Sequence, residues 1–285
     1  MTRKSLFYFA LVGLLWGIPY LLMKVAVEDF PPAAVVAGRT LIGASILIPI
    51  AIYRKKFGGA VLGFKYVAFY ALMEMIGPWI LITTAEQKIN SGLAGLLVST
   101  VPIFATIITS LRGDHSVWQF KRLLGIVVGF IGLILVVGIE SLSGNSDPLS
   151  IAMVIVASMG YAYAVIMVTS NLPLVDGIAI NGLAMAITTV FWAPVAIAQW
   201  PSSISMNSAL SLIALGTFST ALAFILFFKV MAEIGPARSS LVTYLNTAIA
   251  VLLGVIILRE PLTVGIIVGL PLVLVGSYLA SKKTA

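Results

Sequence analysis

The sequence predicts an all-α integral membrane protein with ten transmembrane helices, arranged as two inverted five-helix repeats. Three observations predict this class: a strongly apolar composition, ten apolar runs of bilayer-spanning length, and basic residues concentrated in alternate connections between the runs. Of the 285 residues, 60% are hydrophobic and 9% are charged, whereas a soluble domain carries about 25% charged residues. The composition therefore excludes a water-soluble fold.

Each run is close to the ~20 residues that a membrane-spanning helix needs. The first run follows a basic start, as in a signal peptide, but it continues past Trp16 and Pro19 without an A-x-A cleavage pattern. We therefore expect it to form the first helix. In order, the runs cover residues 5–25, 33–53, 64–85, 90–111, 120–139, 149–169, 177–199, 208–230, 236–257 and 263–281.

The most polar connection is Glu140 to Pro148, "ESLSGNSDP", directly after the fifth run. It divides the chain into a first repeat at residues 1–139, a linker at 140–148 and a second repeat at 149–285. An offset of 145 residues pairs Pro49 with Pro194, but few other identities accompany them. The repeat is thus predicted mainly by topology and only weakly by identity.

The distribution of basic residues predicts the orientation, because Lys and Arg concentrate in cytoplasmic connections. If the N-terminus is cytoplasmic, 13 of the 17 basic residues fall on that side, and both termini are cytoplasmic. These 13 are Arg3, Lys4, Arg54, Lys55, Lys56, Lys65, Arg112, Lys121, Arg122, Lys229, Arg238, Lys282 and Lys283. Since each half holds five helices, the second half enters the membrane from the opposite face, as in many secondary transporters.

Several functional classes are disfavoured. The net charge of +7 lies in short tracts without interleaved aromatic residues, so we expect a lipid bilayer and not nucleic acid as the partner. Cysteine is absent and His115 is the one histidine, so we expect no metal site, and we read His115 as a solvated loop residue. Without a Walker-type loop or a catalytic cluster, we expect no cofactor, no ATPase and no enzyme.

Two segments of the chain resemble a known protein family. Residues Gly216 to Ala280, "GTFSTALAFILFFKVMAEIGPARSSLVTYLNTAIAVLLGVIILREPLTVGIIVGLPLVLVGSYLA", resemble the second EamA-type repeat of the drug/metabolite transporter superfamily. Ile89 to Asp114, "INSGLAGLLVSTVPIFATIITSLRGD", resemble the matching part of the first repeat. The chain departs from the family pattern at Thr247, where many members have proline, and in "RGDHS", where many have an acidic residue after the fourth helix. The resemblance implies ten helices and transport, most often export, of small organic solutes such as amino acids, nucleotide-sugar-like and purine metabolites, or cationic drugs.

Glu74 is the leading candidate for substrate binding or coupling. It lies about ten residues from either end of the third run, where a carboxylate costs ~2.5 to 3.5 kcal/mol and normally faces a cavity or a partner. It could exchange a proton or bind a cationic solute. The alternative is a structural ion pair with Arg39, the basic residue well inside the second run. An offset of 145 places Ser219 opposite Glu74, so the charge occurs in one repeat alone.

The remaining candidates are aromatic, polar and proline side chains. Aromatic and polar groups could line a cavity for an amphipathic solute by stacking, cation–π contact and hydrogen bonding, although ordinary helix packing is the alternative for each. These residues are Trp16, Tyr20, Trp79, Tyr163, Tyr244 and Asn246. Pro19, Pro78 and Pro102 are candidate hinges or static kinks.

The resulting functional hypothesis is a secondary active transporter for a small organic solute in the cytoplasmic membrane. Export is favoured, and proton coupling is open. The alternatives are an uncoupled facilitator or channel and a proton-coupled importer. The sequence leaves the identity of the solute and the choice between monomer and homodimer undecided.

Overall fold

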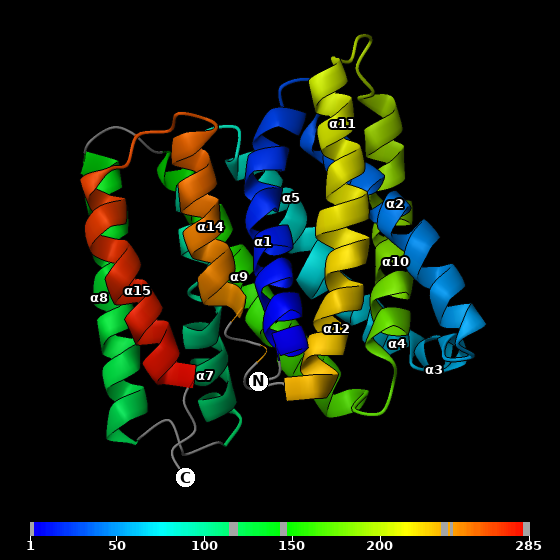
Figure 1. Ribbon diagram of the computed structural model, residues 1–285, viewed down its shortest axis with the longest axis horizontal. Helices are drawn as coiled ribbons and strands as arrows, with labels where there is room; N and C mark the ends of the chain where they lie inside the picture. Colours follow the sequence, from blue (N-terminus) through cyan, green and yellow to red (C-terminus); the bar gives the residue numbers. More distant parts are fainter. Residues whose placement is uncertain (1–2, 114–118, 143–146, 235–238, 240–241, 282–285) are drawn as a thin grey trace.

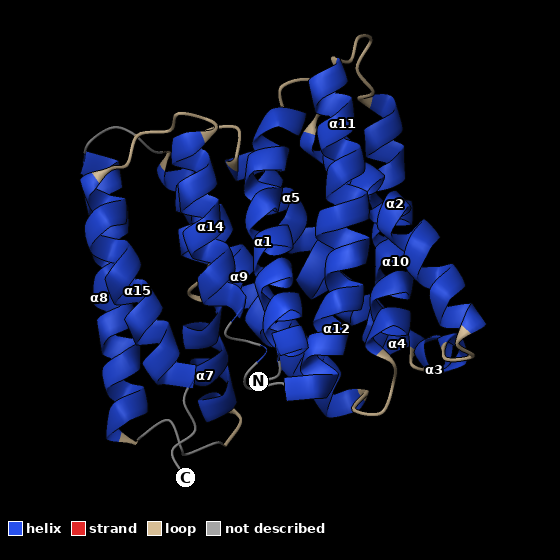
Figure 2. Ribbon diagram, viewed as in Figure 1, coloured by secondary structure: helices blue, strands red, loops and turns tan. Residues whose placement is uncertain are grey.

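The protein folds into a bundle of helices (Figures 1 and 2). The structure is a computed structural model and describes residues 3–113, 119–142, 147–234, 239 and 242–281. Within these residues all regular secondary structure is helical, which agrees with the predicted all-α class. His115 and three of the predicted cytoplasmic basic residues, Arg238, Lys282 and Lys283, lie outside the described part of the chain.

Seven helical stretches of the described residues are long and apolar enough to cross a membrane, and they coincide with predicted runs one to four and six to eight. Four are formed by α1 (Arg3–Ala26), α2 (Pro32–Tyr53), α9 (Pro148–Asn171) and α10 (Gly177–Ala198). The other three are composite: α4 (Phe64–Ala71), η1 (Leu72–Ile76) and α5 (Gly77–Ala85); α6 (Ser91–Val98) and α7 (Val101–Leu111); and α11 (Met206–Ala214), η3 (Leu215–Leu222) and α12 (Ala223–Ile234).

The fifth, ninth and tenth predicted runs also contain helices. They are α8 (Phe120–Leu142), α14 (Val242–Ile256) and α15 (Val264–Ser281). The short α3 (Phe57–Leu62) precedes α4. Since α14 and α15 are shorter apolar helices, the count of ten membrane crossings stays a prediction. The predicted linker is partly helical, because α8 continues to Leu142 and α9 begins at Pro148.

Helices from distant parts of the chain pack side by side. The main pairs are α8 with α15, α2 with α10, α1 with α14, and α5 with α9. Figure 1 shows α8 and α15 together at one edge of the bundle. Large apolar side chains such as Phe7, Ile134 and Val190 are exposed, as expected for helix faces that contact lipid, whereas Leu93, Leu96 and Leu97 fill the centre.

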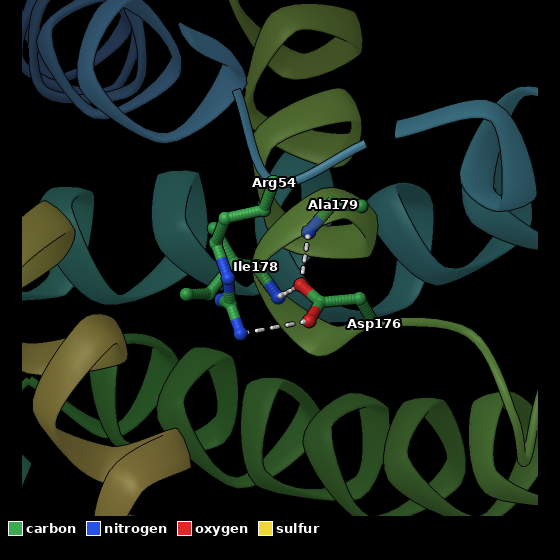
Figure 3. A network of polar contacts seen from close by, with 4 residues as sticks. All are labelled: Arg54, Asp176, Ile178 and Ala179. Atoms are coloured by element: carbon green, nitrogen blue, oxygen red, sulfur yellow. Dashed lines mark hydrogen bonds and ion pairs between the residues drawn. The ribbon is translucent and has the colours of Figure 1, made fainter. Parts of the chain in front are cut away.

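The α2–α10 pair is antiparallel and is joined at one end by a polar contact (Figure 3). Asp176 precedes α10, and its Oδ1 atom accepts hydrogen bonds from the amides of Ile178 (3.0 Å) and Ala179 (3.2 Å). Arg54, just after α2, places Nη2 3.6 Å from Asp176 Oδ2. The carboxylate thus caps the start of α10, while the partly exposed ion pair adds at most about 1 kcal/mol.

Asp147 caps α9 in the same way and makes stability depend on pH. Its Oδ2 atom accepts hydrogen bonds from the Ser150 amide (3.0 Å) and hydroxyl (2.7 Å), and these bonds hold the pKa of Asp147 below its usual value. A carboxylate with a lowered pKa stabilises the fold above its unfolded pKa and loses this contribution as pH falls. We therefore expect Asp147→Asn to melt at a lower temperature than the parent at pH 7.

The difference in melting temperature should narrow as the pH falls below about 4, because protonation then begins to remove the contribution of the Asp147 carboxylate in the parent. Thermal melting in detergent between pH 3 and pH 7 checks this, with the exposed Glu28→Gln as the control. Melting curves of parent and Asp147→Asn that stay equally far apart at every pH would contradict the assignment.

Candidate functional site

Two of the composite spans are interrupted by π-helical turns at corresponding places. In η1, the amide of Gly77 donates to the Leu72 carbonyl, five residues back. Pro78 follows directly, and its lack of an N–H favours a break at this point. The offset of 145 maps Leu72–Ile76 onto residues 217–221, inside η3. Since π-turns within α-helices are frequent at functional sites, these two turns mark the candidate functional site.

Each π-turn holds a buried polar atom without a hydrogen-bond partner. Glu74 Oε2 is such an atom in η1, and Ser219 Oγ is such an atom in η3. The 145-residue offset that aligns the turns also aligns these two residues. Unpartnered polar atoms inside a protein are costly and normally indicate a missing water, ion or ligand. The structure therefore marks two matched positions where a bound group can supply hydrogen bonds.

Gly160 allows α9 to approach the first π-turn closely. A Cβ atom at this position would lie 2.8 Å from the Met73 carbonyl oxygen and 3.1 Å from Pro78 Cγ. On the other side of the turn, the Trp192 indole donates a 3.1 Å hydrogen bond to the Ile76 carbonyl. Neighbouring helices thus hold this irregular backbone, as a membrane interior requires.

Arg39 lies in α2 and is buried near both interrupted spans. Its Nε and Nη2 atoms donate to Thr220 Oγ1 in η3 at 3.4 and 3.1 Å. The guanidinium carbon lies 3.8 Å from the ring centroid of Trp79 in α5. The alternative ion pair with Glu74 is not formed, because the ion pairs among the described residues are Arg54–Asp176 and Lys88–Asp147.

The predicted aromatic residues divide into two groups. Trp79 and Tyr20 are buried, and Tyr161 lies in the neighbourhood of Glu74, Tyr20 and Arg39. Tyr161 was not predicted; the sequence argument chose Tyr163, which is 38% exposed and packs edge-on against Phe69. Residues two apart point to different sides of a helix, so Tyr161 faces the cluster and Tyr163 does not.

The other predicted residues contact different neighbours. Trp16 packs on Phe227 with ring centroids 4.6 Å apart. Tyr244 packs edge-on against Tyr278, and Asn246 Oδ1 accepts a bond from Thr247. The central polar cluster therefore consists of Glu74, Arg39, Thr220, Trp79, Tyr20 and Tyr161, and Ser219 directly precedes Thr220 in η3.

The three predicted prolines occupy different local structures. Pro19 lies inside the continuous α1, and Pro78 lies two residues after the end of η1. Pro102 is in the first turn of α7, after the two residues Ser99 and Thr100 that separate α7 from α6. Two of the three thus mark interruptions of a span, and their role as hinges stays a prediction.

A second polar cluster lies around the last turn of α1, which Figure 1 shows at the end of the bundle opposite the N-terminus. Glu260, which follows α14, accepts hydrogen bonds from the Ser91 amide (2.9 Å), the Ser91 hydroxyl (2.8 Å) and the Gly92 amide (3.3 Å) at the start of α6. Nearby, Lys24 Nζ donates to the carbonyls of Glu86 (2.6 Å) and Ile89 (2.9 Å). We call Glu260, Ser91, Gly92, Lys24 and Glu86 the capping cluster.

We expect Glu260→Gln to destabilise the protein by about 1–2 kcal/mol, because a charged acceptor of helix amides is replaced by a neutral one. The melting temperature should fall, and hydrogen exchange should become faster at Ser91 and Gly92. The exposed Glu28→Gln is the matched control and should change neither quantity. Unchanged exchange at Ser91 would show that the cap contributes nothing to α6.

A bundle of bilayer-length helices, two of them interrupted by π-turns that hold buried polar side chains, is typical of polytopic membrane transporters. The sequence pattern of the EamA-like transporter family matches residues 3–138 and, a second time, residues 148–282. The chain therefore belongs to the EamA-like transporter family and is a membrane transporter, as the sequence resemblance predicted.

Similar proteins agree with this assignment. The uncharacterized transporter YoaV of Bacillus subtilis is 27% identical over 94% of this chain and 93% of its own. The uncharacterized inner membrane transporter YedA of Escherichia coli K12 is 26% identical over 95% of this chain and 90% of its own. A crystal structure with 15% sequence identity shares the fold, with a TM-score of 0.65 and 98% of both chains covered.

Proposed function

We propose that the protein is a secondary active transporter that exports a small organic solute across the cytoplasmic membrane by alternating access. The observation that carries this proposal is the matched pair of π-turns, each with a buried polar atom that lacks a partner. Irregular backbone in the middle of a span is tolerated where it surrounds a binding site, and many carriers bind their substrate there.

Alternating access requires two halves that can exchange conformations, and we propose that these are residues 1–139 and 149–285, joined by 140–148. The double match of the family pattern supports this division. Packing supports it as well: α8 pairs with α15, and α2 pairs with α10, so counterparts in the two proposed repeats are neighbours. Likewise, α5 packs on α9, and its counterpart α12 packs on α1.

The proposed site is the central polar cluster. Glu74 takes up and releases a proton or receives a cationic group of the solute, whereas the uncharged Ser219 provides a hydrogen bond in the other half. Trp79, Tyr20 and Tyr161 supply ring surface for an amino acid-like, nucleobase-like or cationic amphipathic solute. Since the charge occurs on one side of the pair, coupling to protons would involve the first half alone.

The proposed location is the cytoplasmic (inner) membrane, with both termini in the cytoplasm. The basic residues between the apolar runs support this orientation, and the Escherichia coli relative is named as an inner membrane transporter. The proposal requires no cofactor and applies equally to a monomer and a homodimer.

The test is solute movement in vesicles that contain the purified protein. A thermal-shift screen of amino acids, nucleobases and quaternary amines first identifies a ligand, because a ligand that binds the folded state raises its stability. Accumulation of that ligand against its gradient after a pH gradient is imposed supports a proton-coupled carrier. Equilibration alone supports the alternative, a facilitator, and an absence of protein-dependent movement contradicts the proposal.

A further inference from the structure

Arg39 is a buried cation whose contacts include no anion. Of the described carboxylates, none lies within ion-pair distance of its guanidinium. Its three hydrogen bonds go to the Thr220 hydroxyl and, from Nη1, to the Met23 sulfur at 3.7 Å. A thioether is a weak acceptor, and a guanidinium carries five N–H donors. Among the described residues, the direct contacts of the guanidinium are therefore a hydroxyl, a sulfur and the ring of Trp79, and none of these carries a negative charge.

This arrangement is unusual for a charge inside a membrane protein. Buried charges are costly and are normally paired with an opposite charge. Glu74, the carboxylate that the sequence suggested as a partner, lies in a neighbouring span and does not form an ion pair with Arg39. An anion that arrives with the solute would complete the site at the moment of binding.

The geometry of Arg39 selects the kind of anion. One face of the guanidinium lies over Trp79 at 3.8 Å, which fixes its plane. One edge is held by Thr220 Oγ1, so the edge that carries Nη1 remains for another acceptor. Two parallel N–H···O bonds from a guanidinium edge match the oxygens of a carboxylate or a phosphate, and the single negative charge of a carboxylate is the one that a lone arginine neutralises. The flexible side chain of Met23 can move aside, because methionine adapts readily to new neighbours.

We propose that Arg39 binds a carboxylate group of the transported solute. The inference rests on the proposed transport function and narrows its substrate class: the solute carries a carboxylate, which binds the Nη1 edge of Arg39 in place of Met23. Trp79 and Thr220 orient the guanidinium. Of the three solute types named above, the amino acid-like type fits best, because its amino group can face Glu74 while its carboxylate binds Arg39.

Matched pairs of small probes test this proposal on the full-length protein in detergent. L-phenylalanine and phenylethylamine differ by the carboxylate, and phenylacetate and phenylacetamide differ by its charge. We expect the carboxylate of each pair to raise the melting temperature more than its partner does. The same comparison, repeated with further amino acids and their amides, separates the carboxylate effect from the fit of one side chain.

Two variants test the residue. Arg39→Gln should weaken binding of the carboxylate probes by at least about 30-fold, since it truncates a buried hydrogen-bonded charge pair. Arg39→Lys, which keeps the charge but loses the planar fork, should restore part of this binding. Phenylethylamine should bind all three proteins alike. The comparison between probes on the parent protein needs no variant, so it decides the question even if Arg39→Gln fails to fold.

The proposal is overturned if amides stabilise the parent as well as carboxylates do, if no carboxylate probe shifts its melting temperature, or if Arg39→Gln binds carboxylates like the parent. These results are distinct from failure of the transport function. If vesicles transport a cationic solute and carboxylates do not compete with it, the result supports the transport function and overturns carboxylate binding at Arg39. If carboxylates bind at Arg39 but the vesicles transport no solute, the result supports carboxylate binding and contradicts the transport function.

Discussion

Vesicles that contain Glu74→Gln are expected to equilibrate the solute without accumulating it when a pH gradient is imposed. Glutamine has nearly the same shape as glutamate but cannot take up and release a proton. Glu74 lies in η1 in the middle of a span, and its Oε2 atom has no hydrogen-bond partner. A proton can therefore bind there without first breaking an ion pair. The measurement is the ratio of inner to outer solute concentration at steady state.

Two controls separate coupling from folding. Glu28→Gln removes a carboxylate from an exposed position and should accumulate solute like the parent. Ser219→Ala changes the matched residue of the second π-turn, which carries no proton-linked charge, and should retain accumulation with a weaker apparent affinity. Since Glu74→Gln removes a buried charge without a partner, its melting temperature should not fall. Accumulation by Glu74→Gln at the parent level would refute proton coupling at this residue.

Hydropathy was sufficient to predict the helices because a bilayer imposes their length. Seven predicted runs coincide with helical stretches that can cross a membrane, and the ends agree closely, as for 33–53 and α2 (Pro32–Tyr53). The interruptions were harder to predict. Pro78 indicated a kink in the third run, but η3 contains no proline. Its π-turn depends on packing between helices, which leaves no local signal.

The site was predicted one residue at a time, and its connections were not. A charge stands out in an apolar run, so Glu74 and Arg39 were both named as candidates from the sequence. Whether they pair depends on how α2 packs against η1 and η3. Arg39 contacts Thr220, 181 residues away, and no pattern in the sequence links the two. The sequence argument named Tyr163, whereas in the structure Tyr161 lies on the face of α9 that is turned toward the central polar cluster.

The capping cluster could not be predicted from the sequence for a different reason. Glu86 and Glu260 lie at the ends of apolar runs, where charged residues are usually solvated, so neither attracted attention. In the structure Glu86 is buried, and Glu260 binds the start of a helix 169 residues away. Proximity of this kind results from tertiary packing. The sequence signal for this cap is Glu260 in "REPL". The proline after Glu260 cannot continue a helix, so the carboxylate is free to cap another one.

The largest expected effect on stability comes from Gly276→Leu, in the contact between α8 and α15. A Cβ atom at Gly276 would overlap the backbone of Gly129 and lie 2.7 Å from the Gly125 carbonyl oxygen. Backbone atoms cannot move aside as side chains do, so the two helices must separate. We expect a loss of about 3 kcal/mol or more and a clear fall in melting temperature in detergent.

Gly58→Leu is the matched control for this prediction, because a Cβ atom at Gly58 would have no neighbour within 4 Å. It should leave stability unchanged or raise it slightly, since leucine favours a helix more than glycine does. Gly276→Ala should lie between the two, because the overlap begins at Cβ. If Gly276→Leu melts like the parent, α8 and α15 do not approach each other closely at Gly129, and the proposed pairing of counterpart helices loses one of its supports.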